Sequence, residues 1–397
     1  MALRPTLDFL KTEAAGGAAL IGAALLAMVA ANSFWAREYF ELLATPFTVQ
    51  IGGFTQVLSV QDWVRDGLMA VFFFVVGLEI KQEVLKGELS SPRKVALPAA
   101  AALGGMIAPA IVYLTLNLGP GAPQGWPVAT ATDIAFALAA LALVGKGLPE
   151  SLRLFLLALA IAGDLGAVGL IAILYTSHIH VWALLGAAAT LIGLVLLSQW
   201  KDMPFLLRAI GFLVLGGFTL KSGVNTSLAA VAAAMTVPIG PRRPGQEPVL
   251  QHFMHSLHPY VAFGVLPLFA FTTAGVSLAG LSLAALSDMR LLGIVAALFV
   301  GKQLGVMSAV WLAVRSGLAR RPTGATWAEL YGVALLCGVG FSMSLFMGGL
   351  AFAPDGPLAR TELTLGVVAG SLISAAAGMT LLSIAAHRRR LSREMEG

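Results

Sequence analysis

The sequence predicts an all-α polytopic membrane protein with about twelve transmembrane helices and a small outer β-hairpin. Apolar residues make up 58% of the 397 residues and charged residues only 11%, against about 45–50% and about 25% in soluble domains. Apolar runs long enough to cross a bilayer also recur along the whole chain. A soluble chain of this composition would expose large apolar patches and aggregate. This excludes an ordinary soluble enzyme, a disordered chain and a nucleic-acid-binding domain.

The apolar runs are expected to be helices, because unpaired backbone groups are not tolerated in lipid and about 20 helical residues cross the hydrocarbon core. The first run resembles a secretory signal, but its length and the many runs that follow indicate a first membrane helix. The expected ranges are 13–31, 62–85, 95–116, 122–143, 150–175, 181–199, 205–219, 223–236, 258–280, 290–312, 327–350 and 358–385.

The 25 Lys and Arg residues indicate how these helices are oriented. With twelve helices, most of the positive residues fall in the terminal segments and in the alternate loops on the same side. This bias predicts that both termini are cytoplasmic. Because short positive clusters between apolar runs orient membrane helices, the net charge of +5 indicates no nucleic-acid partner, and the expected partner is the lipid bilayer.

Two segments of this single transmembrane domain, residues 1–397, are expected to lie outside the membrane. Residues 48–59 alternate polar and apolar side chains about Gly52-Gly53, which is typical of a β-hairpin. An isolated hairpin is only marginally stable, so this one is expected to pair, for example with a second copy in a homodimer. Residues 237–250, with their Pro, Gly and Arg residues, are expected to form a cytoplasmic linker between two halves of the bundle.

Three ionisable residues fall deep inside expected spans: Asp133, Asp164 and Lys302. Such residues are costly in lipid and usually mark an ion or proton path. The alternative is a buried ion pair that only fixes helix packing. A carboxylate binds either a small cation or a proton, and this competition is itself a mechanism of exchange. The glycines near Asp164 are expected to serve close helix packing; they are Gly163, Gly166 and Gly169.

The fourth and eleventh expected spans contain features that interrupt a helix. The fourth carries Pro127 and a Thr-rich run that includes Thr132, and the eleventh carries Gly338, Gly340 and Ser342. Gly and Ser permit extended backbone within a helical segment. Paired interrupted helices in two halves of a chain are typical of inverted-repeat transporters, with the binding site at the midplane. At the half-helix ends, Asp133 is expected to offset the positive ends and Lys302 the negative ends.

Acidic residues and histidines are expected at the inner ends of two other spans. Glu79 and Glu83 close the second span, either as a solvated helix end or as an acidic mouth that attracts cations. His252, His255 and His258 recur every three residues. Three interpretations are open for these histidines: a solvated helix face, a metal site, or a pH-sensitive surface on the inner side.

Five runs of sequence carry a family resemblance: FFFVVGLEIKQE from Phe72, ATDIAFAL from Ala131, LKSGV from Leu220, LPLFAF from Leu266 and LCGVGFSMS from Leu336. In order and over nearly the whole chain, they resemble the bacterial NhaA sodium/proton antiporters. The resemblance implies inverted repeats, crossed broken helices in spans four and eleven, and an outer hairpin that forms a dimer. It also implies a location in the bacterial cytoplasmic membrane and transport without a resident cofactor.

The chain departs from this family at three positions. The family has two adjacent aspartates on the fifth helix; the second falls on Asp164, but the first falls on Gly163. Lys302, which matches the lysine that can pair with the first aspartate, is therefore expected to pair with Asp164 or Asp133 or to stay unpaired. Two positions linked to pH response in the family fall on Met254 and Asn225.

The leading prediction is a secondary antiporter that exchanges Na⁺ or Li⁺ for H⁺ and so controls intracellular sodium and pH. Four residues are expected to bind the ion or the proton: Asp164, Asp133, Thr132 and Lys302. Asp164 is the main, transient Na⁺ and proton site, Asp133 and Thr132 support it and the broken helices, and Lys302 stabilises the crossing and is a candidate carrier of the exchanged proton. With one carboxylate fewer, we expect a lower proton stoichiometry, as low as electroneutral exchange. The alternatives are a transporter of this fold that carries another cation or solute, and a sensor without transport. A membrane enzyme is not expected, because the sequence has no HExxH, GxSxG or P-loop motif.

Overall fold

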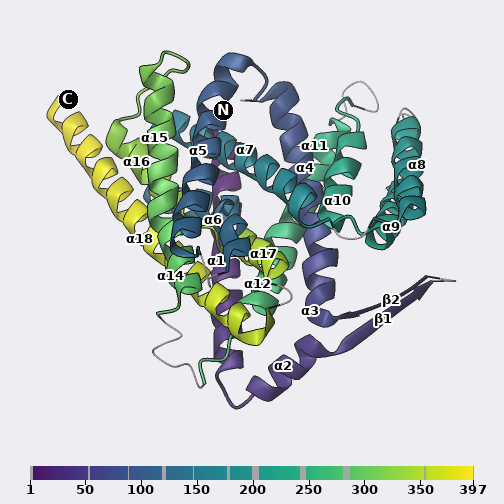
Figure 1. The fold of residues 1–397 in the computed structure, drawn as a ribbon. Coiled ribbons are helices and arrows are strands. Elements are labelled where there is room, and N and C mark those ends of the chain that lie inside the picture. Colours follow the sequence, from purple (N-terminus) through teal and green to yellow (C-terminus); the bar gives the residue numbers. More distant parts are fainter. Residues whose placement is uncertain are drawn as a thin grey trace.

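The computed structural model describes residues 3–51, 54–87, 89–118, 122–145, 147–176, 179–198, 205–241, 247–279, 287–352 and 355–396. Most of them are helical, and the strands form one small hairpin (Figure 1). The elements up to residue 174 are α1 (Leu3–Ala31), α2 (Ala36–Ala44), β1 (Pro46–Ile51), β2 (Phe54–Ser59), α3 (Val60–Trp63), η1 (Val64–Leu68), α4 (Met69–Lys86), α5 (Pro92–Leu116), η2 (Pro123–Ala129), α6 (Ile134–Val144) and α7 (Glu150–Leu174).

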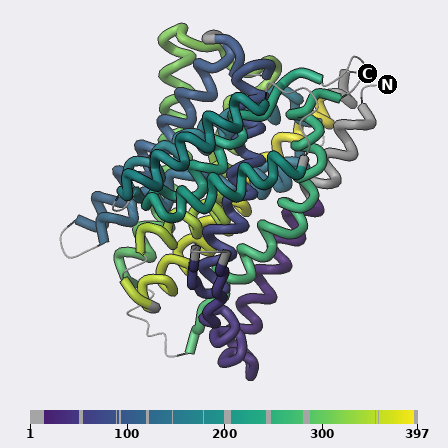
Figure 2. Tube along the Cα trace, turned by 90° about the vertical axis from the view of Figure 1, so that its right-hand side faces the viewer, coloured from purple at the N-terminus to yellow at the C-terminus, as the bar shows by residue number. Residues whose placement is uncertain are grey.

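The remaining elements continue the helical bundle. They are α8 (Val181–Ser198), α9 (Phe205–Ser222), α10 (Thr226–Thr236), α11 (Val249–Tyr260), η3 (Val261–Val265), α12 (Leu266–Ala274), α14 (Met289–Ala296), η4 (Ala297–Gly301), α15 (Lys302–Arg315), α16 (Trp327–Leu336), α17 (Phe341–Ala351) and α18 (Gly356–Glu396). The helices α8, α9 and α10 pack together, and Figure 2 views the molecule from their side.

Among the described residues, six helices are long and apolar enough to cross a membrane, and up to nine spans result if each bent helix pair counts as one. The chain is therefore a multi-pass membrane protein. All twelve expected ranges contain helix, although η2–α6 and α16–α17 are bent by 41° and 45°. Several helices extend beyond the expected ranges: α1 begins at Leu3, the helix expected at 258–280 begins at Val249, and α18 ends at Glu396. An apolar-run criterion cannot detect such an extension, since its polar residues are tolerated in a helix that reaches water.

The hairpin begins two residues before the expected segment. β1 and β2 are antiparallel, with Val49 opposite Gln56 and Pro46 opposite Ser59. The Trp63 indole N–H donates to the Phe47 carbonyl at 2.9 Å, which ties the hairpin to α3. In Figure 1 the hairpin projects away from the helices. The expected turn residues Gly52 and Gly53 lie outside the described part of the chain.

The expected linker at 237–250 is described only at its two ends. Pro241 and Pro248 form an isolated antiparallel bridge, and α11 begins immediately afterwards at Val249. Residues 242–246 lie outside the described residues. The expected linker range therefore overlaps the first turn of α11.

Close helix packing in the bundle centre is clearest between α5 and α15. A Cβ atom on Gly104 would lie 2.2 Å from the Gly305 carbonyl oxygen, and a Cβ on Gly305 would lie 2.1 Å from the Gly104 carbonyl oxygen. Only glycine permits this approach of two backbones. Since Lys302 lies on the same helix as Gly305, the contact places Lys302 beside α5.

Candidate ion-binding site

The breaks in the two bent helix pairs lie against each other. The backbone N–H of Asp133, between η2 and α6, donates to the Val339 carbonyl at 2.8 Å. One residue earlier, the Thr132 hydroxyl donates to the Cys337 carbonyl at 2.9 Å. Extended backbone would leave polar groups unpaired in the bundle interior, and these hydrogen bonds pair part of them across the two breaks.

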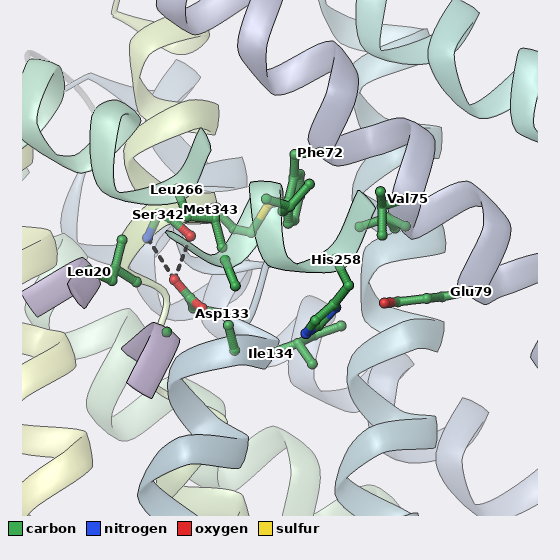
Figure 3. Close-up of a pocket in the computed structure, with 15 residues that line it drawn as sticks. Leu20, Phe72, Val75, Glu79, Asp133, Ile134, His258, Leu266, Ser342 and Met343 are labelled. Carbon is green, nitrogen blue, oxygen red and sulfur yellow. Dashed lines mark hydrogen bonds between the residues drawn. The ribbon is translucent and has the colours of Figure 1, made fainter. Parts of the chain in front are cut away.

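Asp133 accepts hydrogen bonds from the N-terminal turns of two helices. One carboxylate oxygen accepts from the Phe136 N–H of α6 at 3.0 Å, and the other accepts from the Ser342 N–H of α17 at 3.0 Å. The Ser342 hydroxyl also donates to this second oxygen (Figure 3). Asp133 is only 2% exposed. A negative charge at this point therefore satisfies the positive ends of both half-helices.

Lys302 is also buried, at 3% exposure, and its ammonium group donates to two backbone carbonyls. The acceptors are Gly105 on α5, at 2.9 Å, and Thr130 after the last turn of η2, at 2.5 Å. The positive charge thus lies at the carbonyl end of a short helix, where it is favourable. From the sequence, Lys302 is expected to offset the negative ends of the half-helices, but which carbonyls accept its hydrogen bonds is given only by the structure.

Asp164 lies on α7 and is 1% exposed. Among the described residues, neither of its carboxylate oxygens has a hydrogen-bond partner. Glu79, Asp133 and Lys302 act on it electrostatically. A buried carboxylate without partners is costly unless a proton or a cation neutralises it. Asp164 is therefore the group in this site that is chemically suited to bind either one.

The glycines near Asp164 do not all serve close packing, contrary to the expectation from the sequence. A Cβ on Gly166 would lie 2.5 Å from the Met106 sulfur, which is a close contact. A Cβ on Gly163 or on Gly169 would have no heavy atom of another described segment within 4 Å, apart from its chain neighbours and its own helix backbone. Gly163 is nevertheless a buried residue. The missing family aspartate therefore leaves open space beside Asp164 rather than a position filled by a neighbouring helix.

Two connected cavities approach this region. The wider one, of about 390 Å³, is lined by Glu79, Glu83, Met254, His255 and His258, among others. Glu79 and His258 also line a smaller cavity of about 60 Å³ that reaches Asp133 and Ser342. Figure 3 shows Glu79 and His258 on one side of the smaller cavity and Asp133 with Ser342 on the other.

Asp164 lines neither of these two cavities. However, Leu157 and Ile161, which precede it on the same helix, line the wider one. The wider cavity therefore ends close to Asp164 along α7. The structure brings Glu79, Glu83, His255 and His258 together around this mouth.

The histidine repeat forms contacts with the end of the linker. His255 Nδ1 lies 2.6 Å from a Glu247 carboxylate oxygen, and His252 Nδ1 lies 3.5 Å from the other. Among the residues that the structure describes, no group of three or more His, Cys, Asp or Glu side chains is arranged to hold a metal ion. The two histidines and Glu247 therefore form one polar cluster at the start of α11.

Asn225 and Met254 occupy the two positions where the chain departs from the family's pH-response residues. The Asn225 side chain accepts from the Ser227 N–H at 2.9 Å and so caps α10. Met254 lines the wider cavity. Asn225 therefore stabilises the N-terminus of α10, and Met254 contributes an apolar side chain to the lining of the wider cavity.

Three residues at or near the second break, which separates α16 from α17, contact neighbouring segments closely: Gly338, Gly340 and Ser344. Ser344 donates to the Val128 carbonyl at 2.6 Å, across to η2. A Cβ on Gly338 would lie 2.4 Å from the Leu298 carbonyl, and one on Gly340 would lie 2.1 Å from the Ser344 hydroxyl oxygen. Gly338 and Gly340 are therefore needed for close approach at the break. The sequence indicated these glycines, but it did not indicate the contact made by Ser344.

Comparison with known proteins gives full-length matches. A family model described as Na⁺/H⁺ antiporter 1 matches residues 7–382. A Na⁺/H⁺ antiporter NhaA of Rhodospirillum rubrum is 50% identical over 394 residues, which cover 97% of this chain and 98% of that protein. A protein of the same name from Bordetella parapertussis is 47% identical over 385 residues, 95% of each chain. Na⁺/H⁺ antiporter NhaA 1 of Syntrophotalea carbinolica is 44% identical over 400 residues, 99% of this chain and 100% of that one.

Proposed function

Because the chain belongs to the Na⁺/H⁺ antiporter 1 family, we propose that it exchanges Na⁺ or Li⁺ for H⁺ across the bacterial inner membrane. Relatives named as antiporters match it over nearly the full length, and no enzyme family is indicated by these matches. The motif resemblance drawn from the sequence is confirmed by the family match. Exchange of this kind would serve intracellular sodium and pH homeostasis.

The unpartnered carboxylate of Asp164 carries the mechanism. With both oxygens buried and without hydrogen-bond partners in the described structure, it needs either a proton or a cation. The two cannot occupy the carboxylate together, so a proton that enters releases Na⁺, and Na⁺ that enters releases the proton. Na⁺ is a hard cation that prefers oxygen ligands, as a carboxylate provides.

Asp133, Thr132 and Lys302 support this site by holding the two breaks. Asp133 offsets the N-terminal ends of α6 and α17, Thr132 ties the first break to the second, and Lys302 offsets the carbonyl end of η2. With Gly338, Gly340 and Ser342, they maintain two broken helices that cross within an inverted repeat of twelve transmembrane helices. Both termini are then cytoplasmic, as the positive residues indicate.

The wider cavity is the cytoplasmic mouth of the ion path. Glu79 and Glu83 give it a negative field that concentrates cations, and His255 and His258 line the same cavity. The cavities that share Glu79 and His258 support a route from this mouth toward Asp133. Because no second carboxylate stands at Gly163, each cycle carries one proton per Na⁺ and moves no net charge.

A second candidate keeps the fold and changes the cargo. The absence of close contacts around a Cβ on Gly163, within the described part of the chain, favours it, because a site with one carboxylate fewer and unfilled space at that position differs from a Na⁺ site with two aspartates. Under this alternative, Na⁺/H⁺ exchange is weak or lost. Flux assays with several cations and with organic solutes, on the same protein preparation, distinguish the two candidates.

The decisive experiment is Na⁺-driven proton flux in proteoliposomes with Asp164→Asn beside the parent chain. We expect flux in the parent with Na⁺ or Li⁺ and a loss of at least about 100-fold in the variant. The side-chain amide of Asn does not ionise, so it cannot take up and release the transported proton. Asp355→Asn is the matched control: this exposed carboxylate accepts from Gln124 at 2.8 Å, and its variant should transport normally. Undiminished flux in Asp164→Asn would contradict the proposed function.

A further inference from the structure

The last helix, α18, contacts the break between α16 and α17 through Ser371. The Ser371 hydroxyl oxygen accepts hydrogen bonds from the N–H groups of Gly340 and Phe341, each at 3.2 Å. Ser371 is 3% exposed, and no sequence motif singled it out. A hydroxyl that lies 30 residues away along the chain thus pairs backbone donors at the start of α17.

The N-terminal donors of α17 are divided between two side chains. Helix N-termini leave several N–H groups without partners inside the helix. Here Ser371 accepts from Gly340 and Phe341, whereas Asp133 accepts from Ser342. The neutral Ser371 hydroxyl therefore accepts from the first two N–H groups of this turn, and the Asp133 carboxylate accepts from the N–H group that follows.

We propose that Ser371 is a positioning residue for ion exchange: it holds the N-terminus of α17 so that Ser342 meets the Asp133 carboxylate. This inference rests on the proposed function and adds a residue from α18 to the site. Since Asp133 acts electrostatically on Asp164, a shift of the α17 terminus changes the field at the ion site. Without Ser371, two buried N–H groups lose their acceptor and the terminus moves to regain one.

Ser374, one turn further along α18, offers a matched control. It is 0% exposed, and its hydroxyl has no hydrogen-bond partner among the described residues. Its oxygen lies 2.4 Å from the position that a Cβ on Gly338 would take, so it borders the same break. Removal of this hydroxyl leaves no backbone donor of α17 unpaired. Ser371→Ala and Ser374→Ala therefore lie on the same helix, affect buried side chains, and each remove one hydroxyl group.

The first test compares transport by Ser371→Ala, Ser371→Thr and Ser374→Ala in proteoliposomes. We expect Ser371→Ala to raise the KM for Na⁺ about tenfold, the scale expected from leaving buried donors unpaired, with less than about a twofold change in kcat. Ser371→Thr, which keeps the hydroxyl, should restore the parent KM, and Ser374→Ala should match the parent. Equal KM values for Ser371→Ala and Ser374→Ala would overturn the proposal, as would a loss confined to the amount of folded protein.

A second measurement does not depend on transport. Amide hydrogen exchange of a peptide that covers Gly340 and Phe341 should be faster in Ser371→Ala than in the parent, and unchanged in Ser374→Ala. Unchanged exchange in both variants overturns the positioning contact itself. If the parent shows no Na⁺/H⁺ exchange, the proposed function fails and the positioning role in transport fails with it, whereas hydrogen exchange still reports on the contact.

Discussion

At the residue scale, the two buried aspartates differ in their partners rather than in their burial. Asp133 is paired with two helix termini, whereas both oxygens of Asp164 lack partners in the described structure. A paired carboxylate is held in its charged form by its donors, and an unpaired one is available for a proton or a cation. The contacts therefore assign different roles to two residues of identical chemistry.

Gly163 provides a prediction at the same scale. Gly163→Asp should fold, because a Cβ at this position meets no heavy atom within 4 Å, and its added carboxylate should make exchange sensitive to membrane potential. Antiport currents across vesicles under an imposed potential measure this. Gly166→Asp is the comparison, since its Cβ would lie 2.5 Å from the Met106 sulfur, and it should lower the thermal unfolding midpoint. An exchange in the parent that is already potential-sensitive would contradict the one-proton stoichiometry.

At the element scale, the broken helices are held by charges that come from other segments. η2–α6 and α16–α17 bend by 41° and 45°, and the residues at their breaks pair with one another. A straight helix would satisfy the same backbone groups internally. Interruption is tolerated because Asp133, Lys302 and Ser371 supply partners to the buried helix ends.

Removal of the Asp133 carboxylate should destabilise both half-helices at once. Asp133→Ala should lower the free energy of unfolding by about 2–4 kcal/mol, since it removes caps from α6 and α17 and leaves buried donors unpaired. Asp133→Asn should fall between the parent and Asp133→Ala, because its single amide oxygen caps one terminus while its NH₂ group faces a donor at the other. Thermal unfolding in detergent checks this order. Equal stability of all three proteins would show that the double cap does not stabilise the fold.

At the scale of the whole molecule, the hairpin contacts the rest of the chain through α3, where Trp63 donates to the Phe47 carbonyl. Figure 1 shows that it projects away from the helices, and a two-stranded sheet leaves the outer edge of each strand unpaired. The exposed side chains of Phe47 and Val57 add apolar surface to it. We propose that residues 48–59 pair with the same segment of a second copy and so form a homodimer.

Replacement of residues 47–58 by a short Gly-Ser loop tests this assembly. We expect the mass of the protein in detergent to fall from that of a dimer to that of a monomer, because the strand edges are removed. Transport per molecule should remain within about twofold, since the ion site lies wholly within one chain. Light scattering and proteoliposome flux measure the two effects, with the intact chain at equal concentration as the control. Persistence of the dimer would contradict pairing through the hairpin.

Particular residues show how far the sequence alone can go. The apolar runs gave a helix in each expected range, and isolated charges within those runs marked Asp133, Asp164 and Lys302. The sequence did not predict which residues these side chains contact. Lys302 donates to the Thr130 carbonyl, 172 residues away, and Asp133 accepts from Ser342, 209 residues away. Backbone acceptors have no side-chain signature, and Ser371 belongs to no motif.

The sequence by itself determined that this is a multi-pass helical membrane protein of the Na⁺/H⁺ antiporter 1 family, because composition, apolar run length and motifs are local properties of a chain. Only the tertiary structure decided that, of the two aspartates, Asp164 has no hydrogen-bond partner among the described residues, and which two carbonyls accept from Lys302. These features depend on the distances between helices that are far apart in the chain. The packing of those helices fixes which buried charges are satisfied and which one remains available to an ion.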